Sequence, residues 1–226
     1  MRHASVSYFG PLGERPDPER VALTDEGLVQ ADAAGALFAS QRVRFDRVLT
    51  SGLPRTVQTA ERVLARCDQQ VEIERDARLR ELRSGSPEAI APDRLRDAFL
   101  APFEGVVAES TRYLGGESVG EMLDRVLPAL DDAIADRSWQ TMLMVLHGGV
   151  NRVILSRALT GTRTLLAGFQ QAPACINAID VAERPRDWVL RYANLTPYDL
   201  LLADARQTTM ERLIMQYLAG VEARAR

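Results

Sequence analysis

The sequence predicts an α/β fold in which helices cover both faces of a mostly parallel sheet. Short apolar runs suited to strands alternate with longer segments that have helical periodicity. The run 142–146, MLMVL, is apolar at every position, which is typical of a parallel strand buried on both faces. The chain has 226 residues, 46% hydrophobic and 26% charged, which is enough for one well-cored domain and excludes long disorder. We therefore expect a single domain over residues 1–226.

The expected strands are short. The segment 46–50, DRVLT, and the run 142–146 both have the length and composition of buried strands. Two further strands are expected over 176–181 and 188–193, with a turn between them at Pro185.

The expected helices have clear start signals. Thr24 suits the N-cap of the first helix, and acidic residues follow it in the first turn. Pro54 suits the first turn of a second helix, which begins after Ser51. Ser118 and Glu121 have the spacing of a capping box at the start of a third. The remaining helices are expected over 148–159 and 208–223.

The stretch 84–114 differs from the rest of the chain. It contains three prolines, has weak periodicity and includes only a short helical piece near 93–100. We expect it to leave the sheet as an irregular cap within the same domain.

Composition excludes several classes of protein. The net charge is −3 and the isoelectric point is about 5.6, so nucleic-acid binding is not expected. There is no apolar run of membrane-spanning length and no secretory signal at the start, so no membrane association is expected. Cys67 and Cys175 lack the spacing of a zinc site and cannot form a disulfide framework. A reduced, cytoplasmic protein is the resulting expectation.

The sequence has no lysine and only two histidines. All 28 basic residues are arginines, so lysine chemistry is excluded, and the only histidines are His3 and His147. His147 follows the run 142–146 and precedes Gly148, which places it at the carboxyl end of a buried strand, where ligands bind in such sheets. The glycine would let a ligand approach backbone N–H groups at a helix start. Taken singly, each histidine is more often a structural or surface residue.

The order of several motifs along the chain favours a functional role for both histidines. The chain reads RHA at 2–4, LTDEG at 23–27, FDRVLTSGLPRTVQTA at 45–60, LREL at 79–82, GGES at 115–118 and VLHGG at 145–149. This succession resembles branch 1 of the histidine phosphatase superfamily, the phosphoglycerate-mutase-like proteins, in register over residues 2 to about 160. The resemblance implies a phosphoglycerate-mutase-like fold.

The resemblance also implies a role for each site residue. His3 matches the family histidine that attacks phosphorus, which requires a neutral imidazole with a free lone pair. Arg2 and Arg55 match the arginines that bind phosphoryl oxygens through their guanidinium forks. His147 matches the second histidine, which contacts the transferring phosphoryl group, and Gly148 belongs to the same substrate-binding motif. No cofactor and no metal ion are implied.

Glu81 matches the family carboxylate that protonates the leaving oxygen and then activates water. Without the resemblance, a surface charge cluster with its neighbouring arginines is the more ordinary interpretation. The implied function is metal-independent hydrolysis of a small phosphomonoester through phosphohistidine. Phosphoglycerate-mutase-type transfer and a catalytically weak binding or scaffold protein are the alternatives, and the oligomeric state, including a homodimer, stays open.

Two departures from the family pattern bear on these alternatives. Met1 leaves little of the strand that usually precedes the Arg-His motif, so we expect a truncated first strand or a start upstream of Met1. Phe9 stands where many members have asparagine, and 84–114 lacks an adjacent basic pair for a phosphoglycerate carboxylate. Both Phe9 and the missing pair favour a phosphatase over a mutase. Tyr8 and Phe9 suit either an aromatic mouth for a partly apolar substrate or surface packing.

Overall fold

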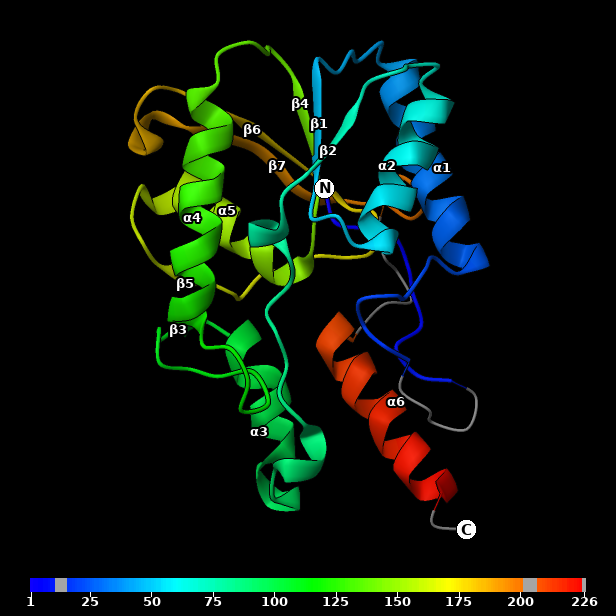
Figure 1. Ribbon diagram of the computed structural model, residues 1–226, viewed down its shortest axis with the longest axis vertical. Helices are drawn as coiled ribbons and strands as arrows, with labels where there is room; N and C mark the ends of the chain where they lie inside the picture. The colour runs from blue at the N-terminus through cyan, green and yellow to red at the C-terminus, as the bar shows by residue number, and fades with distance from the viewer. Residues whose placement is uncertain (11–15, 201–206, 225–226) are drawn as a thin grey trace.

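A three-stranded parallel sheet lies at the centre of the protein (Figure 1). The computed structural model describes residues 1–10, 16–200 and 207–224. The sheet has the order β2-β1-β4, and its strands span Ile73–Arg75, Arg47–Thr50 and Met142–Val145. Val48 pairs with Ile73 on one side and with Leu143 on the other. The N-terminal segment continues this sheet beyond β4, because Arg2 pairs with Leu146 in the parallel sense.

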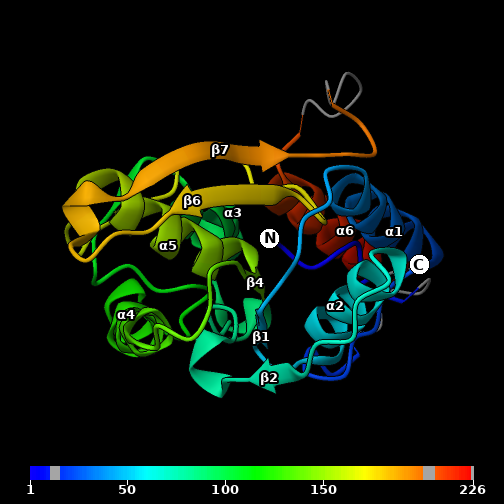
Figure 2. The same cartoon turned by 90° about the horizontal axis from the view of Figure 1, so that it is seen from above.

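Helices cover both faces of the sheet. Helices α1 (Asp25–Ser40) and α2 (Pro54–Arg66) lie on one face, and α4 (Val119–Ala135) and α5 (Gly148–Thr160) lie on the other (Figure 2). Each face has its own apolar core: Val48 belongs to one buried cluster and the next residue, Leu49, to the other. This alternation follows from the pleat of the strand. The predicted α/β fold with a parallel sheet flanked by helices is confirmed.

The predicted helix starts are also observed. The Thr24 hydroxyl accepts a hydrogen bond from the N–H of Gly27 at 3.1 Å and caps α1. Ser118 and Glu121 form a reciprocal capping box at α4. Pro54 is the first residue of α2, where its missing N–H leaves no helical hydrogen bond unmade.

The remaining strands lie outside the central sheet. Strands β6 (Ile176–Asp180) and β7 (Val189–Leu195) form an antiparallel hairpin whose connection contains the 3-10 turn Pro185–Asp187. Strand β2 was not predicted, because it has only three residues, none of them fully buried. Two-residue strands β3 (Val106–Val107) and β5 (Leu165–Leu166) pair with each other in the antiparallel sense.

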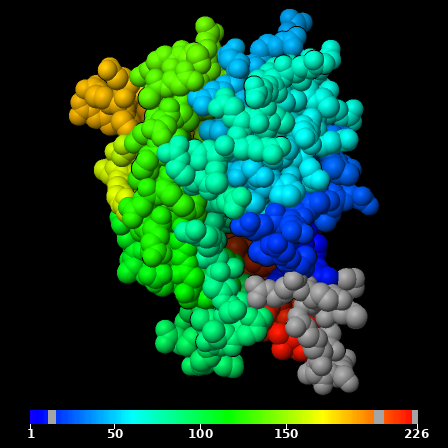
Figure 3. Space-filling view, in the orientation of Figure 1, coloured from blue at the N-terminus to red at the C-terminus, as the bar shows by residue number. Residues whose placement is uncertain are grey.

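The segment 84–114 contains mostly short elements. The helical piece expected near 93–100 is observed as α3 (Leu95–Leu100). Helix α6 (Thr209–Arg224) packs against α3, and the rings of Phe99 and Tyr217 lie 5.8 Å apart. In the space-filling view, α6 is visible between the N-terminal segment and the green residues of 84–114 (Figure 3). The 3-10 turns of this segment are Pro87–Ala89, Pro92–Arg94 and Ala101–Phe103.

Both cysteines, Cys67 and Cys175, are buried free thiols. Among the described residues, none of the helices combines the length and the hydropathy that a membrane span requires.

Candidate active site

The two histidines meet at the carboxyl end of the sheet. The N–H of His3 donates to the carbonyl of Leu146 at 2.8 Å, and the carbonyl of His3 accepts from the N–H of Ala174 at 3.1 Å. His147 follows Leu146 directly, as the N-cap of α5. Two neighbouring parallel segments thus end side by side, and the rings of His3 and His147 lie 5.2 Å apart at 65°.

Among the described residues, the ring of His3 forms a hydrogen bond through Nδ1 and none through Nε2. Its Nδ1 lies 2.8 Å from the carbonyl oxygen of Ala4. A carbonyl can only accept, so Nδ1 carries the proton, and in the neutral ring Nε2 holds the lone pair. Burial lowers the pKa of His3 well below its usual value, and the charges of Arg2 and Arg55 lower it further. His3 is therefore a neutral imidazole with a nucleophilic Nε2.

His147 is completely buried and has one unused ring nitrogen. Its Nε2 lies 2.8 Å from Oγ of Ser51, the first residue after β1. Its Nδ1 is buried and has no hydrogen-bond partner among the residues that the structure describes. Burial lowers the pKa of His147 well below its usual value, followed by the effects of His3 and Arg55. A neutral ring with an open position beside His3 is suited to contact a bound group.

Arg2 and Arg55 are anchored through one nitrogen each. Nη1 of Arg2 donates to the carbonyl of Gln171 at 2.6 Å and to the hydroxyl of Thr209 at 2.9 Å. Nη1 of Arg55 donates to the carbonyl of Pro18 at 2.6 Å. In both residues Nε is buried without a partner in the described part of the chain, and no ion pair with a described carboxylate neutralises either guanidinium. Buried, uncompensated guanidinium groups form a site for an anion.

Glu81 reaches the same place from outside the sheet. It follows the 3-10 turn η1 (Ala77–Leu79). Its two carboxylate oxygens accept the N–H of Gly149 at 3.1 and 3.0 Å. A methyl group built on Gly149 would lie 2.4 Å from Oε1 of Glu81, so this approach requires glycine at position 149.

Several charged groups converge on Gly148. A methyl group built there would lie 3.3 Å from Nη1 of Arg152, 3.7 Å from Oε2 of Glu81 and 3.8 Å from Nε of Arg2. The structure therefore brings the residues singled out from the sequence into one site. A site with a neutral nucleophile, guanidinium donors and a carboxylate can transfer a phosphoryl group.

An ion pair holds the main chain that carries Glu81. Arg125 of α4 donates to the carbonyls of Arg78, Arg80 and Glu81 at 2.7, 2.5 and 3.0 Å. The same guanidinium forms two bonds of 2.7 and 2.8 Å to the carboxylate of Glu117, which is 2% exposed. Burial alone would raise the pKa of Glu117, but the hydrogen bonds from Arg125 and the N–H of Arg83 outweigh it and lower the pKa. We call Arg125 and Glu117 the clamp.

Three features of the site were not predicted. Ser51 could have been found from its place at the end of a strand, where polar side chains collect. Arg152 could have been found as a charged residue within an apolar helix segment, VNRVIL at 150–155. The clamp had no usable signal, because Glu117 lies before the N-cap of α4 and eight positions from Arg125, outside the three- and four-residue spacings that bring side chains together on a helix.

No group of three or more His, Cys, Asp and Glu side chains within residues 1–10, 16–200 and 207–224 is arranged to hold a metal ion.

The chain matches the model of a known protein family over most of its length. The family model for the histidine phosphatase superfamily, branch 1, matches residues 1–196. The chain belongs to this superfamily. Arg2 and His3, the residues that resemble the family's Arg-His motif, lie within the matched residues and at the centre of the site described above.

Curated relatives of this chain include both phosphoglycerate mutases and an acid phosphatase. The chain is 29% identical over 164 residues to 2,3-bisphosphoglycerate-dependent phosphoglycerate mutase 2 of Latilactobacillus sakei, covering 59% of this chain and 72% of the relative. It is 28% identical over 160 residues to an acid phosphatase of Mycobacterium tuberculosis, covering 70% and 72%. The structure of the alpha-ribazole phosphatase from Shigella flexneri matches with a TM-score of 0.66 and 23% identity, covering 86% of this chain and 94% of that one. These similarities support a hydrolase or phosphoryl-transfer enzyme.

Proposed function

We propose that the protein hydrolyses small phosphomonoesters through a phosphohistidine on His3, without a metal ion. The observation that carries this proposal is a set of buried polar atoms beside His3 that have no hydrogen-bond partner among the described residues: Nε of Arg2, Nε of Arg55 and Nδ1 of His147. Buried polar groups are normally hydrogen-bonded, so a cluster of such atoms marks the place of a ligand. Two guanidinium groups make that ligand an anion, and the transferred phosphoryl group fits.

The first step forms a bond between Nε2 of His3 and phosphorus. As it forms, the bond from phosphorus to the ester oxygen breaks, and the leaving oxygen takes a proton from the carboxyl group of Glu81. Arg2 and Arg55 stabilise the charge on the phosphoryl oxygens in the transition state. We assign the Ser51 hydroxyl as donor to Nε2 of His147, its shortest contact, which puts the imidazole proton on Nδ1 for a phosphoryl oxygen.

The second step returns the enzyme to its starting state. A water molecule gives a proton to the carboxylate of Glu81 and attacks phosphorus, while the bond to Nε2 of His3 breaks. Orthophosphate leaves, Glu81 is protonated again, and His3 recovers its lone pair. Arginines supply the positive charge that a metal ion supplies in other phosphoryl-transfer enzymes.

The mutase alternative requires the phosphoryl group to return to a bound sugar acid. Phe9 supports hydrolysis instead: its ring packs against the core and lies 6.1 Å from Tyr217, where many family members place a polar contact. Tyr8 lies 5.8 Å from the guanidinium carbon of Arg55, so an aromatic wall borders the phosphate site. The substrate is a small molecule in this proposal, and a cytoplasmic location, favoured by the free thiols of Cys67 and Cys175, is part of it.

Trapping the intermediate tests this function. Wild type and His3→Gln are mixed with an aryl phosphate carrying labelled phosphorus and quenched in base. We expect base-stable, acid-labile phosphate on the wild type and none on the variant, with turnover lower by about four orders of magnitude or more. The same assay in EDTA is expected to leave wild-type turnover unchanged.

A folded His3→Gln protein, shown by an unchanged circular dichroism spectrum, makes the comparison valid. Turnover near the wild-type rate in that variant would refute the proposed nucleophile. Incubation with 3-phosphoglycerate and a trace of bisphosphoglycerate separates the alternatives: isomerisation without release of phosphate supports a mutase, and no isomerisation by enzyme that hydrolyses the aryl phosphate supports a phosphatase.

A further inference from the structure

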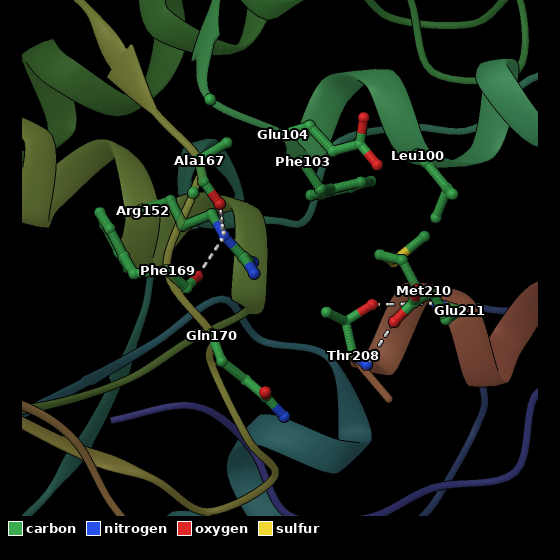
Figure 4. Close-up of a pocket in the computed structure, with 12 residues that line it drawn as sticks. Leu100, Phe103, Glu104, Arg152, Ala167, Phe169, Gln170, Thr208, Met210 and Glu211 are labelled. Carbon is green, nitrogen blue, oxygen red and sulfur yellow. Dashed lines mark hydrogen bonds between the residues drawn. The ribbon is translucent and has the colours of Figure 1, made fainter. Parts of the chain in front are cut away.

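Residues of α3, α5 and the start of α6 line a cavity of about 270 Å³ (Figure 4). Three parts of the chain line it: residues 100–105 after α3, Arg152 of α5 with the segment 167–170, and the start of α6 at 208–211. These segments are far apart in sequence and meet only in the folded protein.

Arg152 connects the cavity to the phosphate site. Its Nη1 donates to the carbonyl of Gly148 at 3.1 Å, the glycine on which Arg2 and Glu81 also converge. The anchor of Arg2 on Thr209 lies next to Thr208, which lines the cavity. Arg152 and the segment Thr208–Thr209 therefore belong both to the cavity wall and to the surroundings of the phosphate site.

Part of the cavity wall is apolar. Leu100, Phe103 and Met210 line it, and the guanidinium carbon of Arg152 lies 5.6 Å from the centre of the Phe103 ring. Such a wall favours an alcohol with an apolar or ring-shaped body, because binding removes apolar surface from water.

The guanidinium group of Arg152, at the base of the cavity, already donates hydrogen bonds to main-chain carbonyls. Nε of Arg152 donates to the carbonyls of Ala167 and Phe169 at 3.2 and 3.1 Å, in addition to the bond to Gly148. Burial lowers the pKa of Arg152 to about 10, and the charge of Arg2 contributes to the shift. Nε2 of Gln170 is buried without a partner in the described part of the chain and is free to donate to a hydroxyl group.

Two carboxylates line the same cavity. Glu211 is held in a capping box with Thr208, whose N–H donates to Oε2 at 2.7 Å and lowers the pKa of the carboxyl group. Glu104 is exposed at the other side of the cavity (Figure 4). Among the described residues that line the cavity, one arginine and two glutamates give a net charge of −1. A second anionic group on the substrate would be repelled here.

We propose that this cavity is the leaving-group subsite, and that it selects phosphomonoesters of neutral or cationic alcohols over those with a carboxylate or a second phosphate. This inference rests on the proposed function and narrows its substrate class. On this proposal, small di-anionic metabolites are poor substrates, because their second anionic group would lie in a cavity where glutamates outnumber arginine among the described lining residues.

Matched aryl phosphates test this selection. Phenyl phosphate is the reference, and its para-aminomethyl, para-hydroxymethyl and para-carboxymethyl derivatives place a cation, a neutral hydroxyl or an anion in the cavity. We expect kcat/KM to be roughly fivefold or more higher for the aminomethyl than for the carboxymethyl ester, the size of effect that one partly exposed charge pair supports.

Variants assign the effect to the cavity. Glu104→Gln removes an exposed charge without burying anything, and it is expected to reduce the ratio between the two charged esters. Glu72→Gln, an exposed glutamate that does not line the cavity, is the matched control and should leave the ratio unchanged.

The outcomes separate the two proposals. Equal kcat/KM for all four esters, or a preference for the carboxymethyl ester, overturns the leaving-group inference and leaves the phosphatase function standing. A ratio that Glu72→Gln changes as much as Glu104→Gln also overturns it. No turnover of any ester, including phenyl phosphate, overturns the proposed function itself.

Discussion

The two histidines and Glu81 reach the same point with different kinds of support. His3 and His147 sit at the ends of paired parallel segments, and backbone hydrogen bonds to Leu146 and Ala174 fix their positions. Glu81 lies in an irregular segment beyond η1, and the clamp of Arg125 and Glu117 holds the carbonyls of that segment. His3, the proposed nucleophile, is thus placed by the sheet, and Glu81 is placed by side chains, so mutations should affect the two halves of the site separately.

On the carboxylate side of the site, the largest expected effect comes from Glu81 itself. Glu81→Gln should slow alkyl phosphates by about 10²- to 10⁴-fold and aryl phosphates much less, because an alkoxide needs a proton to leave and a phenolate needs it less. Steady-state kinetics on a matched alkyl and aryl pair measures the difference. Equal slowing of both classes would give Glu81 a structural role instead.

A smaller effect is expected from the clamp. Arg125→Gln frees three carbonyls of the Glu81 segment, so it should lower kcat for alkyl phosphates by about tenfold, with less change in KM or in aryl turnover. Glu117→Gln, which keeps the shape of the side chain, should give the same pattern more weakly. In combination with Glu81→Gln, the Arg125 substitution should add little.

Arg83→Gln provides a matched control for the clamp. Arg83 pairs with the same carboxylate of Glu117 through a side chain that is 73% exposed, and it does not bind the carbonyls that Arg125 holds. Its removal should leave the alkyl-to-aryl ratio unchanged. A ratio that moved as far in Arg83→Gln as in Arg125→Gln would mean that charge near Glu117, not positioning of Glu81, is responsible.

The smallest effect concerns stability and the histidine half of the site. The pKa values of His3 and His147 are lowered in the folded protein, so the unfolded chain binds more protons below its ordinary histidine pKa of about 6.5. The free energy of unfolding should fall as pH drops from 6.5 toward the lowered values, by up to about 1.4 kcal/mol per pH unit for each histidine. The histidine contribution is flat above that window.

Urea unfolding at pH 7.5, 6.5 and 5.5 measures this slope. The amine of Met1, whose pKa burial lowers to about 6, titrates in the same range, so the slope of the wild type is compared with that of His3→Gln. A shallower slope is expected in the variant. Identical slopes would show that His3 is not held in its neutral form by the fold.

Features of the fold and of the site that depend on neighbouring residues could be predicted from the sequence. The strand 142–146 was visible as an unbroken apolar run, so the place of His147 at its end followed from local pattern. The helix caps at Thr24 and Ser118 were also local signals. Such features depend on neighbouring residues, and their physical cause acts within a few positions of the chain.

Features that depend on distant contacts were not visible. The N–H of Gly149 binds a carboxylate 68 positions earlier in the chain, and Arg125 binds carbonyls 44 to 47 positions away. Glu81 was identified through the resemblance to a family, since its own neighbours suggested only a surface charge cluster. The cavity beside Arg152 is formed by three separate segments and had no sequence signal at all.

The anchored guanidinium groups have one consequence for the end of the catalytic cycle. Arg2 and Arg55 bind phosphoryl oxygens whether these belong to a substrate or to the released orthophosphate, since both present the same oxygens to the same donors. On the proposed mechanism, free orthophosphate is a competitive inhibitor, and the selectivity of the neighbouring cavity gives no protection against it. The activity would then respond to the phosphate supply of its surroundings, with no separate regulatory site.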